Sequence, residues 1–337
     1  MILINELAAL KKRNTFGVEA TCRRWVECDN EEELLNFITA DGLKPGDFFV
    51  LGGGSNVLFT ADYQGAIIHP AIRGRKLAGA EGTDILVRVG AGESWDEFVS
   101  WAVDRGFWGV ENLSMIPGRV GAAPVQNIGA YGVEIGDRVA RVEAIDAERG
   151  ERVTLDGVAC RFGYRDSIFK NEWRDRFIVT RVTFRLSKTP CPRLDYKGVQ
   201  EEIDREGEPT LPVIRRAITR LRESKLPDVR AMGNAGSFFK NPVVEQALAD
   251  RLLEKHPKMP VYPAGEGQVK LAAAWLVERS GSKKSTIGGA GVHDKQALVL
   301  VNKRGATGDD ILRLANEIQR GVLLRFGVQL QPEVTIL

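Results

Sequence analysis

The sequence of 337 residues contains few of the side chains that bind metals or form disulfides. It has only three histidines and four cysteines, which are Cys22, Cys28, Cys160 and Cys191. The cysteines form no C-x-x-C pair, so a zinc site is not expected, and reduced thiols in a cytoplasm are the simpler interpretation. No apolar run approaches the length of a membrane span. We therefore expect a cytoplasmic protein that binds no metal and enters no membrane.

The sequence also has no excess of charge of one sign. Lys and Arg together number 47 and Asp and Glu 45, which gives a formal net charge of +2. This balance gives no indication of a nucleic-acid or membrane surface. The first residues, MILINELAALKKRN, place their charges after the apolar part and contain no small-residue cleavage site, so they do not predict a secretory signal.

Residues at helix ends mark several helices. Ser94 and Glu97 predict a capping box at the start of a helix that a glycine ends. Thr307 and Asp310 suit the start of a long amphipathic helix, which also ends at a glycine. Residues 269–281, VKLAAAWLVERSG, predict a further helix.

The order of strand-like and helix-like segments along the chain predicts an α+β organisation. Alternating residues predict strands before residue 187, among them 177–187. Residues 188–226 are polar and interrupted by prolines at first and then predict a helix, and a smaller α+β unit follows from 227. The length of the chain suffices for two or three domains.

The first candidate binding motif is LGGGSNVLF, residues 51–59. Three consecutive glycines let backbone N–H groups approach a diphosphate, and the serine and asparagine add donors. The motif is not the dinucleotide-binding fingerprint, because Val57 occupies its third glycine position and a strand follows. The chain also contains no P-loop motif. A tight hairpin is the alternative interpretation.

The second candidate is IPGRVGAAPVQNIGAYGVEIGD, residues 116–137. Its small residues would let a large planar ligand lie against the backbone, and the amides of Gln126 and Asn127 could read a heteroaromatic rim. The alternative is a glycine-rich surface loop, which its length and the near-absence of charge in residues 121–131 make less favourable. Arg119 is the long cation within this loop.

Three more residues stand in informative contexts. Arg165, in FGYRDSIFK, could face a substrate carboxylate or simply pair with Asp166. Glu333, in QPEVTIL, alone would be interpreted as a solvated edge charge. Ser237, in GNAGSFFKNP, has no histidine in a suitable context, so a hydrolase triad is not expected. Ser237 could cap the following helix, although Asn241 is the better cap.

These motifs together resemble a known family. The segments GGGSNVLF, IPGRVGAAPVQNIGAYGVE, FGYRDSIFK, GNAGSFFKNP, VKLAAAWLVE and PEV occur in this order in UDP-N-acetylenolpyruvoylglucosamine reductases, and the likeness covers nearly the whole chain from Asn14 onward. The connector contains LDY with Tyr196, as in the class of the family that has a tyrosine loop.

The resemblance implies a fold and a set of domains. The fold is α+β, with an FAD-binding part of the vanillyl-alcohol-oxidase type made of two subdomains and a third, substrate-binding α+β domain. We expect subdomain 1 in residues 1–69, subdomain 2 with the connector 188–226 in residues 70–226, and the substrate-binding domain in residues 227–327. The C-terminal strand, 328–337, is expected near the site.

The resemblance also assigns residues to the site. It implies that Arg165, Ser237 and Glu333 are catalytic. The residues expected to hold FAD lie in the two glycine-rich motifs and are Gly52, Gly53, Gly54, Ser55, Asn56, Pro117, Gly118, Gly121, Gln126, Asn127 and Gly129. The residues expected to hold the uridine diphosphate-sugar are Tyr164, Tyr196, Lys225, Asn241 and Gln296.

The activity implied is the reduction of UDP-N-acetylglucosamine enolpyruvate by NADPH, through non-covalent FAD, in bacterial peptidoglycan precursor synthesis. Ser237 would donate a proton to carbon after hydride transfer from flavin N5, while Arg165 and Glu333 stabilise the enolate-like intermediate. We expect a monomer. A related FAD oxidase or dehydrogenase with another substrate, and a non-catalytic nucleotide-sugar-binding protein, are the two alternatives.

Overall fold

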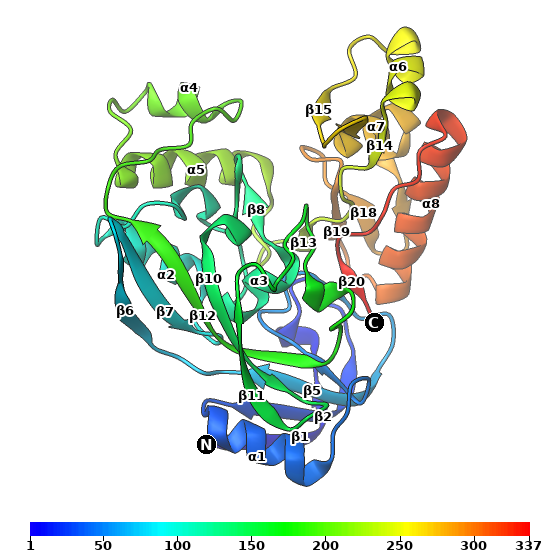
Figure 1. Ribbon diagram of the computed structural model, residues 1–337. Coiled ribbons are helices and arrows are strands. Elements are labelled where there is room, and N and C mark those ends of the chain that lie inside the picture. Colours follow the sequence, from blue (N-terminus) through cyan, green and yellow to red (C-terminus); the bar gives the residue numbers. More distant parts are fainter. The chain divides into compact units, whose positions relative to one another are not determined.

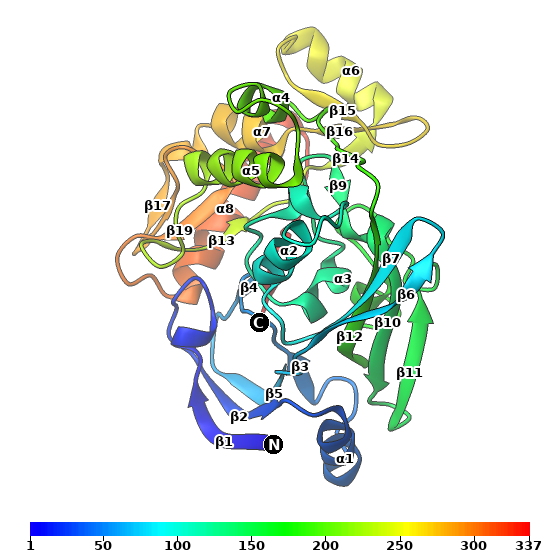
Figure 2. The same ribbon diagram turned by 90° about the vertical axis from the view of Figure 1, so that its left-hand side faces the viewer.

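The computed structural model describes residues 1–337, and the chain divides into two units (Figures 1 and 2). Unit 1 consists of Met1–Ala8, Cys22–Gly53 and Gln64–Ser224. Unit 2 consists of Ala9–Thr21, Gly54–Tyr63 and Lys225–Leu337. Each unit is therefore assembled from three separate stretches of the sequence.

Unit 1 begins with a four-stranded sheet and one helix. The strand order is β1 (Ile2–Ala9), β2 (Thr21–Cys28), β5 (Tyr63–Pro70) and β3 (Phe48–Val50). Helix α1 (Glu31–Asp41) starts at Asn30, whose side chain accepts hydrogen bonds from the N–H groups of Glu32 and Glu33. Leu34 and Ile38 of α1 are buried in one core with residues of the sheet. The strand β3, which precedes the first glycine motif, is thus held in a packed layer.

A five-stranded antiparallel sheet forms the larger part of unit 1. Its order is β11 (Glu151–Asp156), β10 (Val139–Asp146), β12 (Phe177–Ser187), β7 (Asp84–Gly90) and β6 (Arg75–Glu81). The strand predicted over 177–187 is confirmed, and Val182, Phe184 and Leu186 are fully buried, but the alternation is incomplete because Thr183, which lies between Val182 and Phe184, is buried as well. The same core includes residues of α2 (Trp95–Val103), α3 (Ala123–Gln126), α4 (Val199–Ile203) and α5 (Leu211–Lys225).

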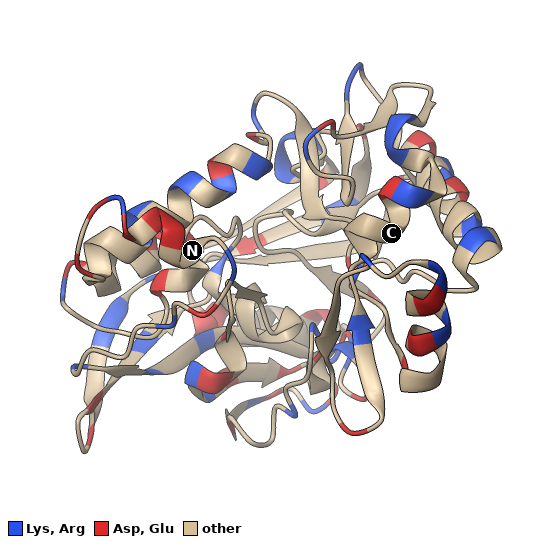
Figure 3. Cartoon of the chain, turned by 90° about the horizontal axis from the view of Figure 1, so that it is seen from above, with Lys and Arg blue, Asp and Glu red and all other residues tan.

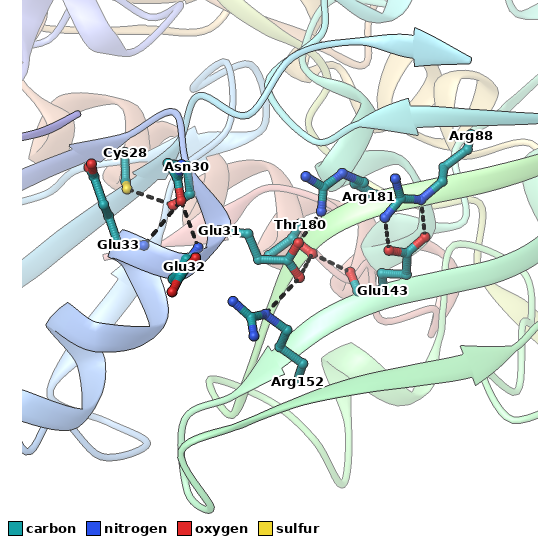
Figure 4. Close-up of polar contacts among 10 residues, drawn as sticks. All are labelled: Cys28, Asn30, Glu31, Glu32, Glu33, Arg88, Glu143, Arg152, Thr180 and Arg181. Carbon is teal, nitrogen blue, oxygen red and sulfur yellow. Dashed lines mark hydrogen bonds and ion pairs between the residues drawn. The ribbon is translucent and has the colours of Figure 1, made fainter.

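A group of charged and polar side chains joins α1 to the five-stranded sheet (Figure 4). Glu31, the first residue of α1, accepts a hydrogen bond from the Thr180 hydroxyl at 3.0 Å and forms an ion pair with Arg181. The Nε of Arg152 lies 3.9 Å from the same carboxylate. Across β12, which lies between their strands β7 and β10, the Nε of Arg88 donates to Glu143 at 2.6 Å. The two sheets of unit 1 are thus connected through charge as well as through the chain.

Unit 2 contains three small sheets and three helices. The first sheet has the order β13 (Gly233–Ser237), β19 (Val299–Asn302), β18 (Ala290–Val292) and β17 (Thr286–Ile287). The second has the order β14 (Val243–Glu245), β16 (Gln268–Leu271) and β15 (Val261–Pro263), and the third pairs β20 (Thr335–Ile336) with β4 (Val57–Leu58). The helices are α6 (Gln246–Lys255), α7 (Ala273–Ser280) and α8 (Gly308–Phe326).

The remaining elements are short. They are β8 (Gly129–Ala130), β9 (Val133–Glu134), and the 3₁₀ turns η1 (Lys11–Arg13), η2 (Glu111–Leu113), η3 (Val120–Ala122), η4 (Ile135–Arg138), η5 (Ile168–Lys170) and η6 (Ser282–Lys284).

The predicted ends of α8 are confirmed, whereas two other local predictions are corrected. Thr307 and Asp310 form both bonds of a capping box. At α2 the predicted box is wrong, because the Ser94 side chain makes no capping bond and the Glu97 carboxylate lies 3.4 Å from a guanidinium nitrogen of Arg75. The helix predicted over 269–281 is also shorter, because its first residues pair as strand β16 with both β14 and β15.

Candidate functional site

The first glycine motif follows β3 and is packed too closely for side chains. A Cβ atom on Gly53 would lie 2.8 Å from the Cα of Gly118, and one on Gly54, whose φ is 63°, would lie 2.0 Å from the Arg13 carbonyl oxygen. Glycine is therefore required at both positions. The alternative of a tight hairpin is wrong, because β3 pairs with β5 and β4 pairs with β20.

The second motif is bound to the framework of unit 1 by backbone hydrogen bonds and is not a surface loop. The Gly121 N–H donates to the Ala91 carbonyl at 2.9 Å, and the Trp95 N–H donates to the Gly118 carbonyl at 3.1 Å. A Cβ atom on Gly121 would lie 2.6 Å from that of Ala91. Arg119 points back to this framework, since its Nη1 donates to the Gly92 carbonyl at 3.3 Å. The close approach of Gly53 to Gly118 places the first and second motifs against each other.

Asn127 holds the second motif together internally. Its Nδ2 donates to the Glu134 carboxylate at 2.9 Å and to the Gly163 carbonyl at 2.7 Å, and its Oδ1 accepts from the Gly136 N–H at 2.8 Å. Asn127 is buried, and its φ is 42°. The side chain therefore joins the motif to the segment that carries Tyr164 and Arg165.

Arg165 lies against the second motif. Its Nη2 donates a hydrogen bond to the Gly129 carbonyl, its Nη1 lies 4.0 Å from the Glu134 carboxylate, and its guanidinium carbon lies 5.3 Å from the centre of the Tyr164 ring. A Cβ atom on Gly129 would lie 2.6 Å from Nη1. The backbone of Arg165 has a φ of 54°, a left-handed conformation that costs energy in a residue with a side chain. The carboxylate of Asp166 accepts hydrogen bonds from Asn171 at 3.1 Å.

Tyr196 packs against a second tyrosine that sequence analysis did not select. The rings of Tyr196 and Tyr131 are 5.3 Å apart and meet edge to face. Burial raises the pKa of Tyr131, while the charge of Arg222 opposes that change. Burial in turn lowers the pKa of Arg222, whose Nε has no hydrogen-bond partner. The position of Arg222, three residues before Lys225, is the one sequence signal that could have drawn attention to it.

In unit 2, Ser237 is the last residue of a strand, and the backbone of Glu333 is hydrogen-bonded to the residue that follows it. Ser237 pairs with Val299 of β19. The N–H of the next residue, Phe238, donates to the Leu298 carbonyl at 2.7 Å, and its carbonyl accepts from the Glu333 N–H at 2.8 Å. The hydrogen bond between Phe238 and Glu333 thus joins two parts of the chain that are almost a hundred positions apart in sequence. The capping alternative for Ser237 is wrong, because β14 follows it and Glu245 stands at the N-cap of α6.

Other predicted residues of unit 2 surround these two. Asn56 donates from its side chain to the Glu333 carbonyl at 3.0 Å. The Gln296 carbonyl accepts from the Val299 N–H at 3.0 Å, which ties it to the residue that pairs with Ser237. Asn241 caps a helix other than the predicted one, since its Oδ1 accepts at 2.9 Å from the N–H of Ala273, the first residue of α7.

The predicted residues are thus divided between the two units. Unit 1 contains Gly52, Gly53, the second motif, Tyr164, Arg165 and Tyr196, and unit 2 contains Gly54, Ser55, Asn56, Lys225, Ser237, Asn241, Gln296 and Glu333. Neither set has three or more His, Cys, Asp or Glu side chains arranged to hold a metal ion. None of the helices has both the length and the apolar character needed to cross a membrane.

The chemistry of the two glycine-rich motifs fits a dinucleotide. The stretch from residue 117 to residue 129 contains no acidic side chain that would repel a diphosphate, and the stretch from 52 to 56 contains none either. Glycines have no side chain to shield a backbone N–H group, although that of Gly121 already donates to Ala91, and Ser55 and Asn56 have short polar side chains.

Two family models match the chain. UDP-N-acetylenolpyruvoylglucosamine reductase, C-terminal domain, matches residues 228–337, and FAD binding domain matches residues 23–156. Among proteins named UDP-N-acetylenolpyruvoylglucosamine reductase, that of Chromobacterium violaceum is 47% identical over 331 residues and covers 97% of each chain. That of Bacteroides fragilis is 45% identical over 329 residues and covers 98% of each chain.

Solved structures show the same fold. The UDP-N-acetylenolpyruvylglucosamine reductase of Thermus caldophilus, 24% identical, covers 100% of this chain and 98% of its own, with a TM-score of 0.69. The expected α+β fold with an FAD-binding part of the vanillyl-alcohol-oxidase type is confirmed.

Proposed function

Because the chain belongs to the UDP-N-acetylenolpyruvoylglucosamine reductase family, we propose that it reduces UDP-N-acetylglucosamine enolpyruvate to UDP-N-acetylmuramate with NADPH. The family membership makes it an FAD-binding oxidoreductase of cell-wall synthesis. The observation that supports the proposal most is the backbone hydrogen bond from the Glu333 N–H to the Phe238 carbonyl, which holds the backbone of Glu333 next to the strand that ends in Ser237.

The two glycine-rich motifs would hold FAD without a covalent bond. The N–H groups of Gly52, Gly53 and Gly54, with Ser55 and Asn56, suit the diphosphate. The small residues of the second motif, from Pro117 and Gly118 through Gly121 and Gln126 to Gly129, suit the path toward the flavin ring. Asn127 would act by fixing this motif and by tying it to Gly163, since these are the partners of its side-chain bonds. When bound, FAD supplies the hydride for the reaction.

The protein residues would stabilise the negative charge that develops on the substrate after hydride transfer and would then supply a proton. When a hydride adds to the terminal carbon of the enolpyruvyl double bond, negative charge develops at the neighbouring carbon and spreads into the carboxylate. The fixed positive charge of Arg165 would stabilise this enolate-like species, with Glu333 as its proton-shuttling or orienting partner. The basic carbon then takes a proton from the Ser237 hydroxyl, and no histidine is required. One hydride and one proton together saturate the double bond.

The uridine diphosphate-sugar would be held by Tyr164, Tyr196, Lys225, Asn241 and Gln296. Lys225 offers a positive charge, and the others offer hydroxyl and amide groups to phosphate and sugar oxygens. Asn241 also caps α7 through its Oδ1, which leaves its Nδ2 as the group for substrate. We assign residues 1–69 and 70–226 to the two FAD-binding subdomains and residues 227–327 to the substrate domain. We further expect a cytoplasmic monomer.

Anaerobic half-reactions test this function. NADPH should bleach the flavin absorbance of the purified protein, and the enolpyruvyl substrate should then restore it without oxygen. Reoxidation by oxygen alone would favour an oxidase, and a colourless protein that binds uridine diphosphate-sugars would favour a non-catalytic role. Because one site serves both substrates in this scheme, NADPH and the enolpyruvyl substrate should compete, and ping-pong kinetics are expected.

A further inference from the structure

Asn112 connects two segments of unit 1 that are far apart in sequence. It lies in η2 and is 1% exposed. Its Nδ2 donates to the Tyr131 carbonyl at 2.9 Å and to the Arg193 carbonyl at 2.8 Å. Its Oδ1 is buried and has no hydrogen-bond partner. A buried oxygen without a hydrogen-bond partner costs free energy. The orientation of the Asn112 amide is therefore fixed by the two bonds that its Nδ2 donates.

The turn that carries Asn112 is itself fixed on both sides. The Glu111 carboxylate accepts from the Gly109 N–H at 2.6 Å, and the Ser114 hydroxyl donates to the Glu111 carbonyl at 2.6 Å. The indole Nε1 of Trp95 donates to the Leu113 carbonyl at 2.9 Å. Asn112 therefore projects from a rigid base in the core.

Both segments that Asn112 holds carry a tyrosine. Tyr131 has a left-handed φ of 49°, which a bulky residue adopts only where its surroundings enforce it. Tyr196 follows Arg193 by three residues, and its carbonyl accepts from the N–H of the fully buried Val199 at 3.0 Å. The backbone is thus fixed before and after Tyr196, while the side chain remains 49% exposed and meets Tyr131 edge to face.

We propose that Asn112 is a positioning residue that holds Tyr196 over Tyr131 in the arrangement that receives the uridine diphosphate-sugar. The proposal rests on the proposed function for the identity of the substrate. Its structural part, that one amide fixes the tyrosine turn to the core, stands independently of that identity. Asn112 itself touches neither reacting group in this scheme.

Replacing the amide separates substrate binding from flavin reduction. Asn112→Leu keeps the approximate size of the side chain and removes both hydrogen bonds. The KM for the enolpyruvyl substrate should rise about tenfold or more, the effect expected for losing two hydrogen bonds, while the rate of flavin reduction by NADPH stays the same. Asn112→Ser can keep one of the bonds and should give a smaller rise. It also keeps the test valid if the leucine variant does not fold.

A double-mutant cycle shows whether the effect passes through Tyr196. In a Tyr196→Ala background, Asn112→Ser should change the KM by less than about twofold, because the side chain that it positions is gone. Additive effects of the two changes would overturn the proposal. The matched control is Asn30→Ala, which also removes an asparagine with two side-chain bonds to backbone in unit 1 and should leave the KM unaltered.

Hydrogen exchange tests the same idea without any substrate. Asn112→Ser should speed exchange in residues 191–197 and leave α1 and the five-stranded sheet unchanged. Equal exchange in the variant and the parent protein would overturn the proposal. If the parent protein fails to turn over the enolpyruvyl substrate, the proposed function fails, and the exchange result still decides the role of Asn112.

Discussion

Unit 1 and unit 2 join distant parts of the chain with different chemistry. In unit 1 several of the long-range connections are pairs of arginine and carboxylate, beside neutral bonds such as that of Asn112 with Arg193. Glu31 pairs with Arg181 across 150 positions of sequence (Figure 4), and Asp96 accepts two bonds, at 2.7 and 2.9 Å, from an arginine, Arg215, 119 positions away. Asp146, 1% exposed, accepts from Arg176 at 2.9 and 2.6 Å.

In unit 2 the corresponding connections are neutral. The Asn302 side chain donates to the Phe16 carbonyl at 3.0 Å, and the Asn234 N–H donates to the Thr15 carbonyl at 3.0 Å. The Asn56 side chain donates to the Glu333 carbonyl, and the Thr335 N–H donates to the Asn56 carbonyl at 3.0 Å. The three stretches of unit 2 are thus connected by hydrogen bonds of backbone and side-chain amide groups.

The two units differ in how charges are paired. Positive and negative residues are interspersed along the chain (Figure 3). In unit 2 the ion pairs are local, for example that of Arg313 with Asp309 one helical turn away. Pairs of an arginine and a carboxylate are sensitive to acid and to the loss of one partner, whereas amide bonds do not titrate. The two units should therefore respond differently to the same treatments.

The largest effect should come from unit 2 and should be chemical. Ser237→Ala should slow flavin reoxidation by the enolpyruvyl substrate by about 10²–10⁴-fold or more, because the carbon loses its proton donor. Flavin reduction by NADPH, FAD binding and the melting temperature should remain near those of the parent protein. Ser237→Cys, whose thiol can also donate a proton, should recover part of the rate. Stopped-flow traces of both half-reactions measure this, and a normal reoxidation rate would remove Ser237 from the mechanism.

The second effect concerns stability and should be larger in unit 1. Asp146→Ala removes a buried carboxylate that Arg176 binds twice; because Arg176 is partly exposed and keeps its ion pair with Glu148, the loss should be about 2–3 kcal/mol of unfolding free energy. The counterpart in unit 2 is Asn302→Ala, which removes the bonds to Phe16 and Ala306 and should cost only about 1–2 kcal/mol. Chemical denaturation of the two variants measures the difference. Equal losses would mean that the contrast between charged and neutral connections has no energetic meaning.

How far the sequence allowed these features to be predicted depends on the range of the interactions. The ends of α8 were predictable because Thr307 and Asp310 act within one turn of the helix. The motif around Ser237 could be noticed in the sequence because its residues are contiguous, and the role of Ser237 stays a prediction. The helix capped by Asn241 was not predictable, since its partner, Ala273, is 32 positions away. Nor was Asn112, whose second acceptor is 81 positions away.

The pattern of units was beyond sequence reasoning for the same reason. Residues 9–21 and 54–63 belong to unit 2, although they precede its main stretch by more than 160 positions. Only tertiary bonds such as that of Asn302 with Phe16 reveal this membership. The three-domain division of residues 1–69, 70–226 and 227–327 stays a prediction.

Acid should sharpen the contrast between the units. Burial disfavours the charged form of Asp146, but hydrogen bonds from Arg176 outweigh it and lower its pKa; at Asp96 burial is likewise outweighed, by Arg215 and the Met115 N–H. A carboxylate whose folded pKa lies below its unfolded value contributes stability above about pH 4, and this is lost as pH falls through the folded pKa.

Unit 1 should therefore lose protection first as the pH falls below about 4. Hydrogen exchange resolved by segment, at neutral and at acid pH, measures this for β10 and α2 of unit 1 and for β13 and β19 of unit 2. Asp146→Asn should flatten the acid dependence of β10. Earlier loss of β13 and β19 would contradict the assignment of acid sensitivity to unit 1.

The smallest effect should come from a charge pair of unit 1 that water reaches. Arg24 of β2 forms a bidentate pair with Asp41, the last residue of α1, and their side chains are 25% and 30% exposed. Water screens this pair, and both long side chains lose freedom to form it, so Asp41→Asn should cost no more than about 1 kcal/mol of unfolding free energy. The free energy from denaturation, compared with that of Asp146→Asn, measures the part that burial plays, because both changes replace a carboxylate bound twice by an arginine with an amide. A loss at Asp41 as large as that at Asp146 would show that the number of bonds, and not burial, sets the strength of the charged connections in unit 1.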